Sequence, residues 1–350
     1  MREGRFSARL PVRILIRATN WIGDAVMSLP ALRQVRGRFP DAHIAVLGRP
    51  GVLDLYSRES FSNETVPLAG SSFSRKYTLA VSLRRMRFDC AILFQNAFGA
   101  AALAFAARIP RRIGYARDGR SPLLTCAVRV PRPGEIPRHE SYYYLELLRR
   151  AGLMDAPLPE EPEIRLEGAD RACANGTRLL AAAGLEPPAI GISPGAAYGG
   201  AKRWLPERFA EAAVSIARAS GHPVALFGSA AERDLCGSIA GQVAAHKIPA
   251  VNFAGETTLA RFIDMAAACA VFLTNDSGAM HVASALGVPT VAIFGATDHV
   301  ATGPAGAHSR VVRHPVECSP CLLRQCPIDH RCMTRVGAAE VAETALHLLK

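Results

Sequence analysis

The feature that most constrains the fold is a regular alternation of two kinds of segment. Short, nearly continuous apolar runs are typical of buried strands, and here they alternate with stretches in which apolar residues recur at helical spacing. The apolar runs lie at residues 13–17, 43–47, 89–94, 189–193, 223–227, 270–274 and 290–294. Clear helical patterns lie at 206–220 and 258–270. Because strands that are apolar on both faces must be covered on both faces, the alternation predicts an α/β protein with parallel, doubly wound sheets.

A change in composition near the middle of the chain predicts two domains. The chain has 350 residues, which exceeds one small domain, and the stretch DAPLPEEPEIRLEG at 155–168 is rich in proline and acid. We expect a first Rossmann-like domain over 1–165, a linker region over 166–188 and a second such domain over 189–350. The last segment, 336–349, is expected to be a helix, with packing back on the first domain as one option.

The excess positive charge is confined to the first half of the chain. The net charge is +11, and residues 1–165 account for all of it with 26 Lys and Arg against 15 Asp and Glu, whereas residues 166–350 hold 15 of each. One basic half beside a neutral half predicts an anionic partner for the basic half. Nucleic acid is disfavoured because aromatic residues make up only 7% of the chain. Clustered phosphates or an anionic membrane leaflet match better.

The sequence carries no pattern of a secreted or membrane-spanning protein. Its first residues, MREGRFSARL, are basic but lack the apolar core of a signal peptide. The longest apolar run, 98–107, falls short of the roughly 18–20 residues that span a bilayer. We therefore expect a cytoplasmic protein.

The loop after the apolar run 189–193 has the composition of a phosphate-binding loop. It reads SPGAAYGGAKRW, and its glycines let backbone N–H groups approach a ligand while Lys202 supplies a positive charge. The plain alternative is a glycine-rich loop with solvated basic residues. The spacing matches neither a P-loop nor a Rossmann fingerprint.

A second loop, at the start of the helical stretch after 270–274, carries three adjacent polar residues. Asn275, Asp276 and Ser277 precede Gly278, where the free N–H groups of a helix start could bind an anion. A carboxylate would repel phosphate, so Asp276 is better suited to sugar hydroxyls. His281 lies one helical turn further on, and it either faces the same end or packs in the core.

Two acids could each either stabilise the start of a helix or act on a substrate. Glu232, in the loop FGSAAERD after 223–227, could grip ribose hydroxyls or simply stabilise a helix start. Asp24 is the single acid in ATNWIGDAVMSLPA at 18–31, where it could cap a helix or take a proton. Pro30 predicts a kink or restart of that helix within two turns.

Four cysteines are clustered near the C-terminus. Cys318, Cys321, Cys326 and Cys332 follow the pattern C-x2-C-x4-C-x5-C, with His330 close by. The spacing permits a zinc or iron–sulfur site, and proximity permits disulfides. The second pair departs from the paired CxxC of zinc knuckles, so we expect structural cysteines and no metal.

Four motifs together resemble the lipopolysaccharide heptosyltransferases. They are TNWIGDAVMSLPALRQV (19–35), GAAYGGAKRWLPERFA (195–210), NDSGAMHVASALGVPTVAIFGATD (275–298) and CSPCLLRQCPIDHRCM (318–333). The first and last motifs are similar to those of the members that add the second inner-core heptose. The resemblance runs from about residue 13 to the C-terminus.

The resemblance implies a GT-B glycosyltransferase of two Rossmann-like domains facing across a cleft. The implied reaction is inverting transfer of heptose from ADP-L-glycero-D-manno-heptose to the first heptose of heptosyl-Kdo2-lipid A, without metal or other cofactor. Asp24 matches the family's proposed base, and Lys202 its contact to the donor phosphate and sugar. The other implied donor-binding positions are Glu232 at the ribose, Thr257 and Thr258 beside the adenine, and Asp276, Ser277, Gly278 and His281 at the donor sugar and diphosphate.

The residues that would bind the acceptor cannot be matched to the family one by one. The implied acceptor is a phosphorylated lipid at the inner leaflet, which would account for the basic half and for peripheral contact with that membrane. Candidate acceptor-binding residues are Asn20, Arg84, Arg85, Arg117, Arg120 and His139. The alternatives are a family member with another core acceptor, of the first- or third-heptose type, a sugar-nucleotide epimerase on the same fold, and a non-catalytic anion or nucleic-acid binder.

Overall fold

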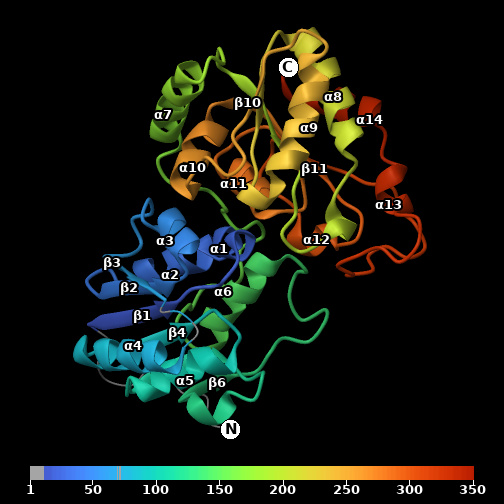
Figure 1. Cartoon of the computed structure of the whole chain (residues 1–350). Coiled ribbons are helices and arrows are strands. Elements are labelled where there is room, and N and C mark those ends of the chain that lie inside the picture. Colours follow the sequence, from blue (N-terminus) through green and yellow to red (C-terminus); the bar gives the residue numbers. More distant parts are fainter. Residues whose placement is uncertain (1–11, 69, 71) are drawn as a thin grey trace. The chain divides into compact units, whose positions relative to one another are not determined.

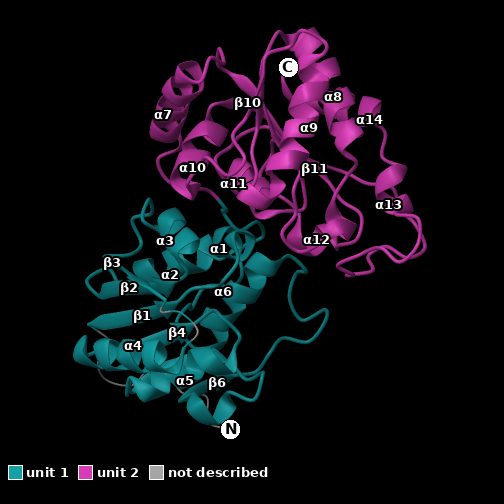
Figure 2. Ribbon diagram, in the orientation of Figure 1, with its two compact units in different colours: residues 1–164 teal, residues 165–350 magenta. Residues whose placement is uncertain are grey.

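The chain forms two compact units in the computed structural model, which describes residues 12–68, 70 and 72–350. Their bounds in sequence are Met1–Ile164 and Arg165–Lys350 (Figure 2). Unit 1 is therefore the basic part of the chain and unit 2 the neutral part.

Unit 1 is built on one parallel sheet of six strands in the order β3-β2-β1-β4-β5-β6 (Figure 1). The strands are β1 (Arg13–Arg17), β2 (His43–Gly48), β3 (Glu64–Pro67), β4 (Cys90–Leu93), β5 (Arg111–Tyr115) and β6 (Cys126–Val128). The helices are α1 (Ile22–Met27), α2 (Leu29–Arg38), α3 (Pro50–Tyr56), α4 (Phe73–Arg85), α5 (Phe98–Ala106) and α6 (Glu140–Arg150), with a 3-10 turn at Ser121–Leu123. The strand order reverses between β1 and β4, and ligands of open α/β sheets bind beyond the carboxyl ends of the strands at such a point.

The core of unit 1 explains why its central strands are apolar on both faces. Leu15 and Leu93 of the sheet pack with Leu83 of α4 and Ala101 of α5, and each of these residues is at most 1% exposed. On the side of α1 and α2 the predicted helix break is present, since α1 ends at Met27 and α2 restarts with Pro30 at its second position. The break orients α1 and its acid independently of the longer helix.

Unit 2 repeats the architecture with a second parallel sheet in the order β12-β11-β10-β7-β8-β9. Its strands are β7 (Ala189–Ser193), β8 (Val224–Leu226), β9 (Ala250–Asn252), β10 (Cys269–Asn275), β11 (Thr290–Ile293) and β12 (Ser309–Val312). Its helices are α7 (Ala169–Ala182), α8 (Pro206–Ser220), α9 (Arg233–Ala244), α10 (Leu259–Ala267), α11 (Gly278–Ala285), α12 (His299–Thr302), α13 (Arg331–Thr334) and α14 (Ala338–Leu348), with 3-10 turns at Gly200–Lys202 and Ala230–Glu232. The order reverses between β7 and β10.

The C-terminal helix α14 belongs to the core of unit 2. It packs on α8, and its inner residues Val341, Ala342 and Ala345 are buried in the same apolar cluster as Ile192 of β7 and Ile293 of β11. The apolar face of α14 is thus used within unit 2.

The predicted fold class is confirmed. Both units are parallel, doubly wound α/β layers with the strand order of a Rossmann sheet. Within the described ranges, none of the helices combines the length and the apolar character needed to cross a bilayer.

Candidate functional site

The loops that follow β7 and β10 bring Lys202 and Asp276 together at the reversal point of the second sheet. Lys202 lies in the 3-10 turn after β7, and its Nζ is 2.6 Å from Asp276 Oδ2 in the loop between β10 and α11. The lysine side chain is 14% exposed and the aspartate side chain 5%. An ion pair this close to the surface can exchange one partner for a ligand, because each group is charged and partly accessible.

Two further groups hold this ion pair in place. Thr297 donates from Oγ1 to Asp276 Oδ2 at 2.6 Å, and the Lys202 ammonium lies 5.0 Å from the centre of the Tyr198 ring. Oδ2 therefore accepts two hydrogen bonds, and the ring face adds a cation–π contact to the lysine. The lysine is a preorganised cation at a strand end and not a solvated surface residue.

Asn275 ties the two loops to each other. Its Oδ1 accepts a hydrogen bond from the backbone N–H of Trp204 at 2.9 Å, and its Nδ2 donates to the Pro194 carbonyl at 2.7 Å. Asn275 is completely buried. Because these bonds span the glycine loop from its first to its last residues, they fix the path along which Lys202 is presented.

Glu232 both caps a helix and faces the glycine loop. Its Oε2 accepts from the backbone N–H and the Oγ of Ser229, each at 2.8 Å, which forms a capping box. Its Oε1 is 3.7 Å from Arg203 Nη2. The cap occupies one carboxylate oxygen, so the other is the one available to hydroxyl groups.

Gly195 provides the space for Glu232. A Cβ at position 195 would lie 1.9 Å from Glu232 Oε1, so Gly195→Ala must displace the carboxylate. We expect this variant to raise the KM for ADP-heptose, the donor that the sequence resemblance implies, about tenfold with little change in kcat, because hydrogen bonds to a charged group would be lost. Steady-state kinetics measures both quantities. Gly241→Ala is the matched control, because a Cβ there meets nothing within 4 Å; an unchanged KM in Gly195→Ala would contradict the contact.

The remaining donor-side candidates lie at the same edge of the second sheet. Thr258 caps α10, accepting the Arg261 N–H at 3.2 Å, and Thr257 precedes it. Ser277 directly precedes α11 and makes no side-chain cap, and its Oγ is 3.2 Å from Thr274 Oγ1. Helix α11 contributes Gly278, its first residue, and His281, which is 4% exposed, to this edge.

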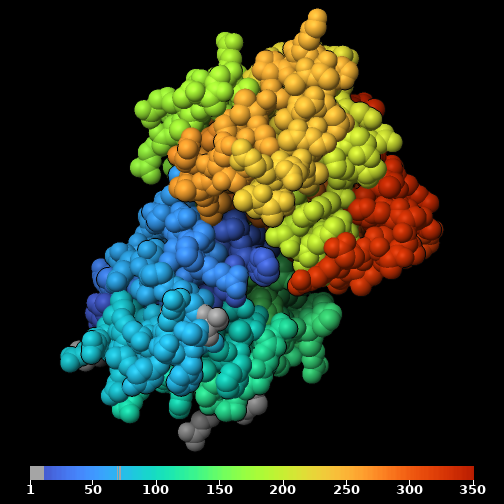
Figure 3. Space-filling view, viewed as in Figure 1, coloured from blue at the N-terminus to red at the C-terminus, as the bar shows by residue number. Residues whose placement is uncertain are grey.

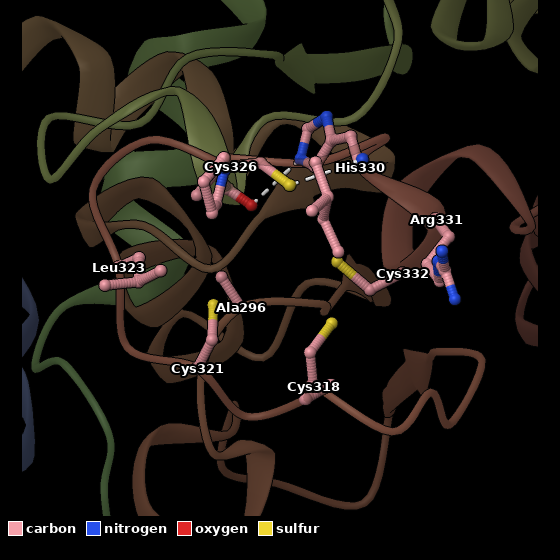
Figure 4. Close-up of a pocket in the computed structure, with 12 residues that line it drawn as sticks. Ala296, Cys318, Cys321, Leu323, Cys326, His330, Arg331 and Cys332 are labelled. Atoms are coloured by element: carbon pink, nitrogen blue, oxygen red, sulfur yellow. Dashed lines mark hydrogen bonds between the residues drawn. The ribbon is translucent and has the colours of Figure 1, made fainter.

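The four clustered cysteines line one small cavity of about 60 Å³ in unit 2 (Figure 4). Cys318 is exposed, Cys321 and Cys326 are half-buried and Cys332 is buried, and all four are free thiols. Burial and the neighbouring thiols raise the pKa of Cys332. Within the described part of the chain, no group of three or more His, Cys, Asp or Glu side chains has the arrangement of a metal site.

The cysteine-rich segment instead contacts the glycine loop. Tyr198 Oη donates to the Leu322 carbonyl at 2.7 Å, and the Ala201 N–H donates to the Arg324 carbonyl at 3.0 Å. His330 Nε2 is 3.0 Å from the Ala201 carbonyl oxygen, and Figure 4 shows His330 beside Cys326. The segment thus braces the residues that directly precede Lys202.

In unit 1, Asp24 lies in the first turn of α1, just beyond the carboxyl end of β1. The helix begins after Trp21, which makes no side-chain cap, and Asp24 is the acid in its first turn. Burial raises the pKa of Glu140 at the start of α6, the negative charge of Asp24 adds to that rise, and the charge of Arg117 opposes it. Two carboxylates and an arginine therefore share one polar region of this unit.

A hydrogen-bonded network surrounds this region. Asn96 donates from Nδ2 to Tyr143 Oη at 2.9 Å, and Arg117 Nη1 is 3.4 Å from the same oxygen. Asn20 accepts at Oδ1 from Arg17 Nη2 at 2.7 Å. His139 caps α6 and accepts the Ser141 N–H at Nδ1.

Three of the residues predicted to contact the acceptor, Arg120, Arg84 and Arg85, are either buried or lie at the other edge of the first sheet. Arg120 is completely buried, and it donates to the Tyr115 and Gln95 carbonyls and to Asn96 Oδ1, so it shapes the loop after β4 and is closed to a ligand. Arg84 and Arg85 are exposed in the last turn of α4. That turn leads into the amino end of the sheet, where Met86 accepts a hydrogen bond from the Arg13 side chain, and Asp24 follows the opposite end of the same strand.

Several side chains of the site were not singled out from the sequence. Arg17 ends β1 and Asn96 follows β4, at the reversal point of the first sheet. Thr297 follows β11, and Glu140 and Tyr143 lie at the start of α6. Thr, Arg, Asn, Tyr and Glu are common residue types, so their identity alone does not indicate a functional site. The topology supplies the signal, because it shows which loops meet.

Comparison with known proteins identifies the family. The family model of glycosyltransferase family 9 (heptosyltransferase) matches residues 76–331. The chain belongs to glycosyltransferase family 9. It is therefore an enzyme of the heptosyltransferase class, and the matched range includes the loops that carry Lys202, Glu232 and Asp276.

Relatives within family 9 span nearly the whole chain. Lipopolysaccharide heptosyltransferase 2 of Salmonella typhimurium is 32% identical over 86% of this chain and 88% of its own length. Lipooligosaccharide heptosyltransferase 2 of Campylobacter jejuni is 28% identical over 97% and 99%. The structure of Escherichia coli ADP-heptose lps heptosyltransferase II is 30% identical and superposes with a TM-score of 0.81, covering 96% of this chain and 98% of that one.

A more distant family 9 structure shares the fold. An E. coli heptosyltransferase solved with ADP-2-deoxy-2-fluoro heptose has 18% sequence identity and a TM-score of 0.72, over 96% of this chain and 99% of that one. The predicted heptosyltransferase class and GT-B fold are thus confirmed.

Proposed function

We propose that this enzyme transfers L-glycero-D-manno-heptose from ADP-heptose to the first heptose of the lipopolysaccharide inner core, with heptosyl-Kdo2-lipid A as acceptor. The observation that carries the proposal is the Lys202–Asp276 pair at the reversal point of the second sheet, 2.6 Å between Nζ and Oδ2. Relatives at about 30% identity that are named heptosyltransferase 2 support the acceptor assignment.

In the proposed donor site each charged group has a separate task. Lys202 and the N–H groups at the start of α11 stabilise the negative charge that develops on the leaving ADP. Asp276 accepts hydrogen bonds from the donor sugar, which replaces its contact to the lysine. Glu232 holds the ribose hydroxyls, and Thr257 and Thr258 lie beside the adenine.

In the proposed acceptor site Asp24 is the general base. Inverting transfer requires the acceptor hydroxyl to attack from the face opposite ADP, and the carboxylate receives its proton as the new bond forms. Asn20, Arg117 and His139, which adjoin the same edge of the first sheet, remain candidates for acceptor contacts. The basic unit would bind the phosphorylated acceptor at the cytoplasmic face of the inner membrane, where the protein associates peripherally.

The test is ADP release from ADP-heptose with three acceptors that differ only in heptose number. We expect turnover with the one-heptose acceptor and little with the heptose-free or two-heptose form, and we expect the same rate in EDTA. Preference for the heptose-free or two-heptose acceptor would indicate a first- or third-heptose enzyme. Chemical change of the donor without an acceptor would indicate an epimerase, and salt-sensitive RNA binding without ADP release would indicate a binding protein.

A further inference from the structure

The cysteine-rich segment, residues 318–332, has no part in the proposed transfer, yet it lies against the loop that carries Lys202. Its four cysteines, Cys318, Cys321, Cys326 and Cys332, line one cavity of about 60 Å³ and are all free thiols. Figure 3 shows the red, C-terminal part of the chain, to which they belong, at the surface of unit 2. A cavity of this volume holds several molecules of the size of water, so a small solute has room beside the thiols.

Cys318 and Cys332 are the best-placed pair of thiols in this cavity. In Figure 4 the Cys318 side chain points toward the sulfur of Cys332. Burial is the main cause of the raised pKa of Cys332, and among the three neighbouring thiols Cys318 makes the largest contribution to it. Cys318 is exposed and Cys332 is buried, so an oxidant from solvent reaches Cys318 first, with Cys332 close behind it.

The backbone of the cysteine-rich segment packs directly on the glycine loop. A Cβ at position 199 would lie 2.2 Å from the Arg324 carbonyl oxygen, and a Cβ at position 200 would lie 2.6 Å from Gln325 Oε1. Neither position has room for a side chain, because the segment occupies that space. Gly199 and Gly200 therefore serve the contact with the segment, and the loop cannot keep its path if the segment moves.

The contacts of Tyr198 connect the segment to the Lys202 ammonium. Tyr198 Oη donates to the Leu322 carbonyl at 2.7 Å. The centre of its ring lies 5.0 Å from Lys202 Nζ and 5.3 Å from the Arg324 guanidinium carbon. Because two of these three partners belong to the segment, the position of the ring beside the lysine depends on that of the segment.

Two residues of the segment that touch the loop have an uncommon backbone conformation. Leu322 and His330 both have a φ of 57°, in the left-handed region that residues other than glycine seldom adopt. Leu322 accepts the Tyr198 hydroxyl, and His330 Nε2 is 3.0 Å from the Ala201 carbonyl oxygen. Such a conformation persists only while the surrounding contacts hold it, so a new covalent bond within the segment would change both contacts.

We propose that Cys318 and Cys332 form a reversible oxidation site, at which hydrogen peroxide joins the two thiols in a disulfide and thereby weakens donor binding at the Lys202 loop. The effect on the donor rests on the proposed function, which places Lys202 at the donor diphosphate. A covalent bond holds two sulfur atoms closer than two free thiols can lie. It therefore draws Cys318 toward the buried Cys332, and residues 319–331, which contact the loop, must rearrange.

The chemistry of the site needs only the two thiols and peroxide. The Cys318 sulfur attacks one peroxide oxygen, the O–O bond breaks, and a sulfenic acid and one water result. The Cys332 sulfur then attacks the sulfenic sulfur, the S–O bond breaks, and the disulfide forms as a second water leaves. Two thiols thus lose two hydrogens, and one peroxide becomes two waters. A dithiol reductant reverses the step by thiol–disulfide exchange.

The experiment treats the reduced, full-length protein with an equimolar amount of hydrogen peroxide. Peptide mapping by mass spectrometry should find Cys318 joined to Cys332, two hydrogens lighter than the dithiol form. Calorimetric titration with ADP should show a Kd at least about tenfold higher than that of the reduced protein, since the hydrogen bonds that hold the loop are lost. Dithiothreitol should restore both the thiols and the affinity.

Matched cysteine variants separate this site from general oxidation. Cys318→Ser should form no disulfide and keep its ADP affinity within about twofold after peroxide; the residue is exposed, so the variant should fold, and thermal melts check this. Cys173→Ser removes another exposed thiol, on α7, and should respond to peroxide as the unaltered protein does.

Several outcomes would overturn the proposal. They are a disulfide between other cysteines, a loss of affinity that persists in Cys318→Ser, an ADP affinity that the disulfide leaves unchanged, and a stoichiometric metal bound by the cysteines of the reduced protein. A reduced protein that does not bind ADP would instead contradict the proposed donor site, while the mapped disulfide would still identify the oxidation site. The two proposals therefore fail separately.

Discussion

Replacing Asp24 with alanine is expected to lower kcat about 10²–10⁴-fold while the dissociation constant for ADP-heptose changes less than about twofold. The proposed donor contacts all belong to unit 2, so removing a base in unit 1 leaves them intact. Single-turnover kinetics measures the chemical step, and calorimetric titration with ADP-heptose measures donor binding. Asp54→Ala, an exposed acid on α3, is the matched control. Weaker donor binding with unchanged turnover at saturation would contradict the assignment.

A second substitution at this position, Asp24→Asn, has a spectroscopic signature. Because the Asp24 charge contributes to raising the pKa of Glu140, Asp24→Asn should lower that pKa, which NMR titration of the Glu140 carboxyl can follow. The sign follows from removing a like charge, which makes ionisation of Glu140 less costly. An unchanged titration would show that the two carboxylates do not interact.

Replacing Lys202 with alanine is expected to have the second large effect on catalysis. We expect kcat/KM for ADP-heptose to fall about 10²–10³-fold, because the variant loses the cation proposed to stabilise the leaving diphosphate. It also leaves Asp276, 5% exposed at its side chain, without its ion-pair partner. Arg208→Ala, which removes an exposed cation from the start of α8, is the control and should change kcat/KM by less than about twofold.

A double variant separates the two roles of Lys202. Asp276→Asn combined with Lys202→Ala removes both charges, so no carboxylate is left unpaired. If Lys202 stabilises the diphosphate directly, Asp276→Asn will not restore turnover to Lys202→Ala. Recovery to the level of Asp276→Asn alone would mean that the lysine serves only to neutralise Asp276.

The central strands were predictable, and the outer ones were not. The apolar runs 13–17 and 189–193 coincide with β1 and β7, because both strands are covered on both faces and must be apolar throughout. The edge strand β3 (Glu64–Pro67) alternates between half-buried and exposed residues. Such strands bury little apolar surface, so hydrophobic periodicity carries no signal for them. The inner strand β5 also escaped prediction because it opens with two arginines.

The candidate site was predictable as a set of loops but not as a set of contacts. That Lys202 and Asp276 follow strands can be seen in the sequence, and that their strands are neighbours cannot. Positive charge alone also led us to expect Arg84 and Arg85 at the acceptor site. The charge of a residue at a helix end does not reveal which edge of the sheet that residue lies at. Arg120 shows the same limit, because burial of a guanidinium among carbonyl groups depends on the tertiary fold.

The bracing of the glycine loop has a consequence for biosynthesis. Tyr198 and Leu322 are 124 residues apart, and Trp204 donates from Nε1 to the carbonyl of Val336, 132 residues further along. At roughly 5–20 residues per second the ribosome needs roughly 6–25 s to cover the first interval. All six strands of the second sheet end by Val312, so a nascent chain can complete its sheet while the Lys202 loop still lacks its contacts with Leu322, Arg324 and Val336. We therefore expect the Lys202 loop to reach its final geometry only after Val336 has left the ribosome.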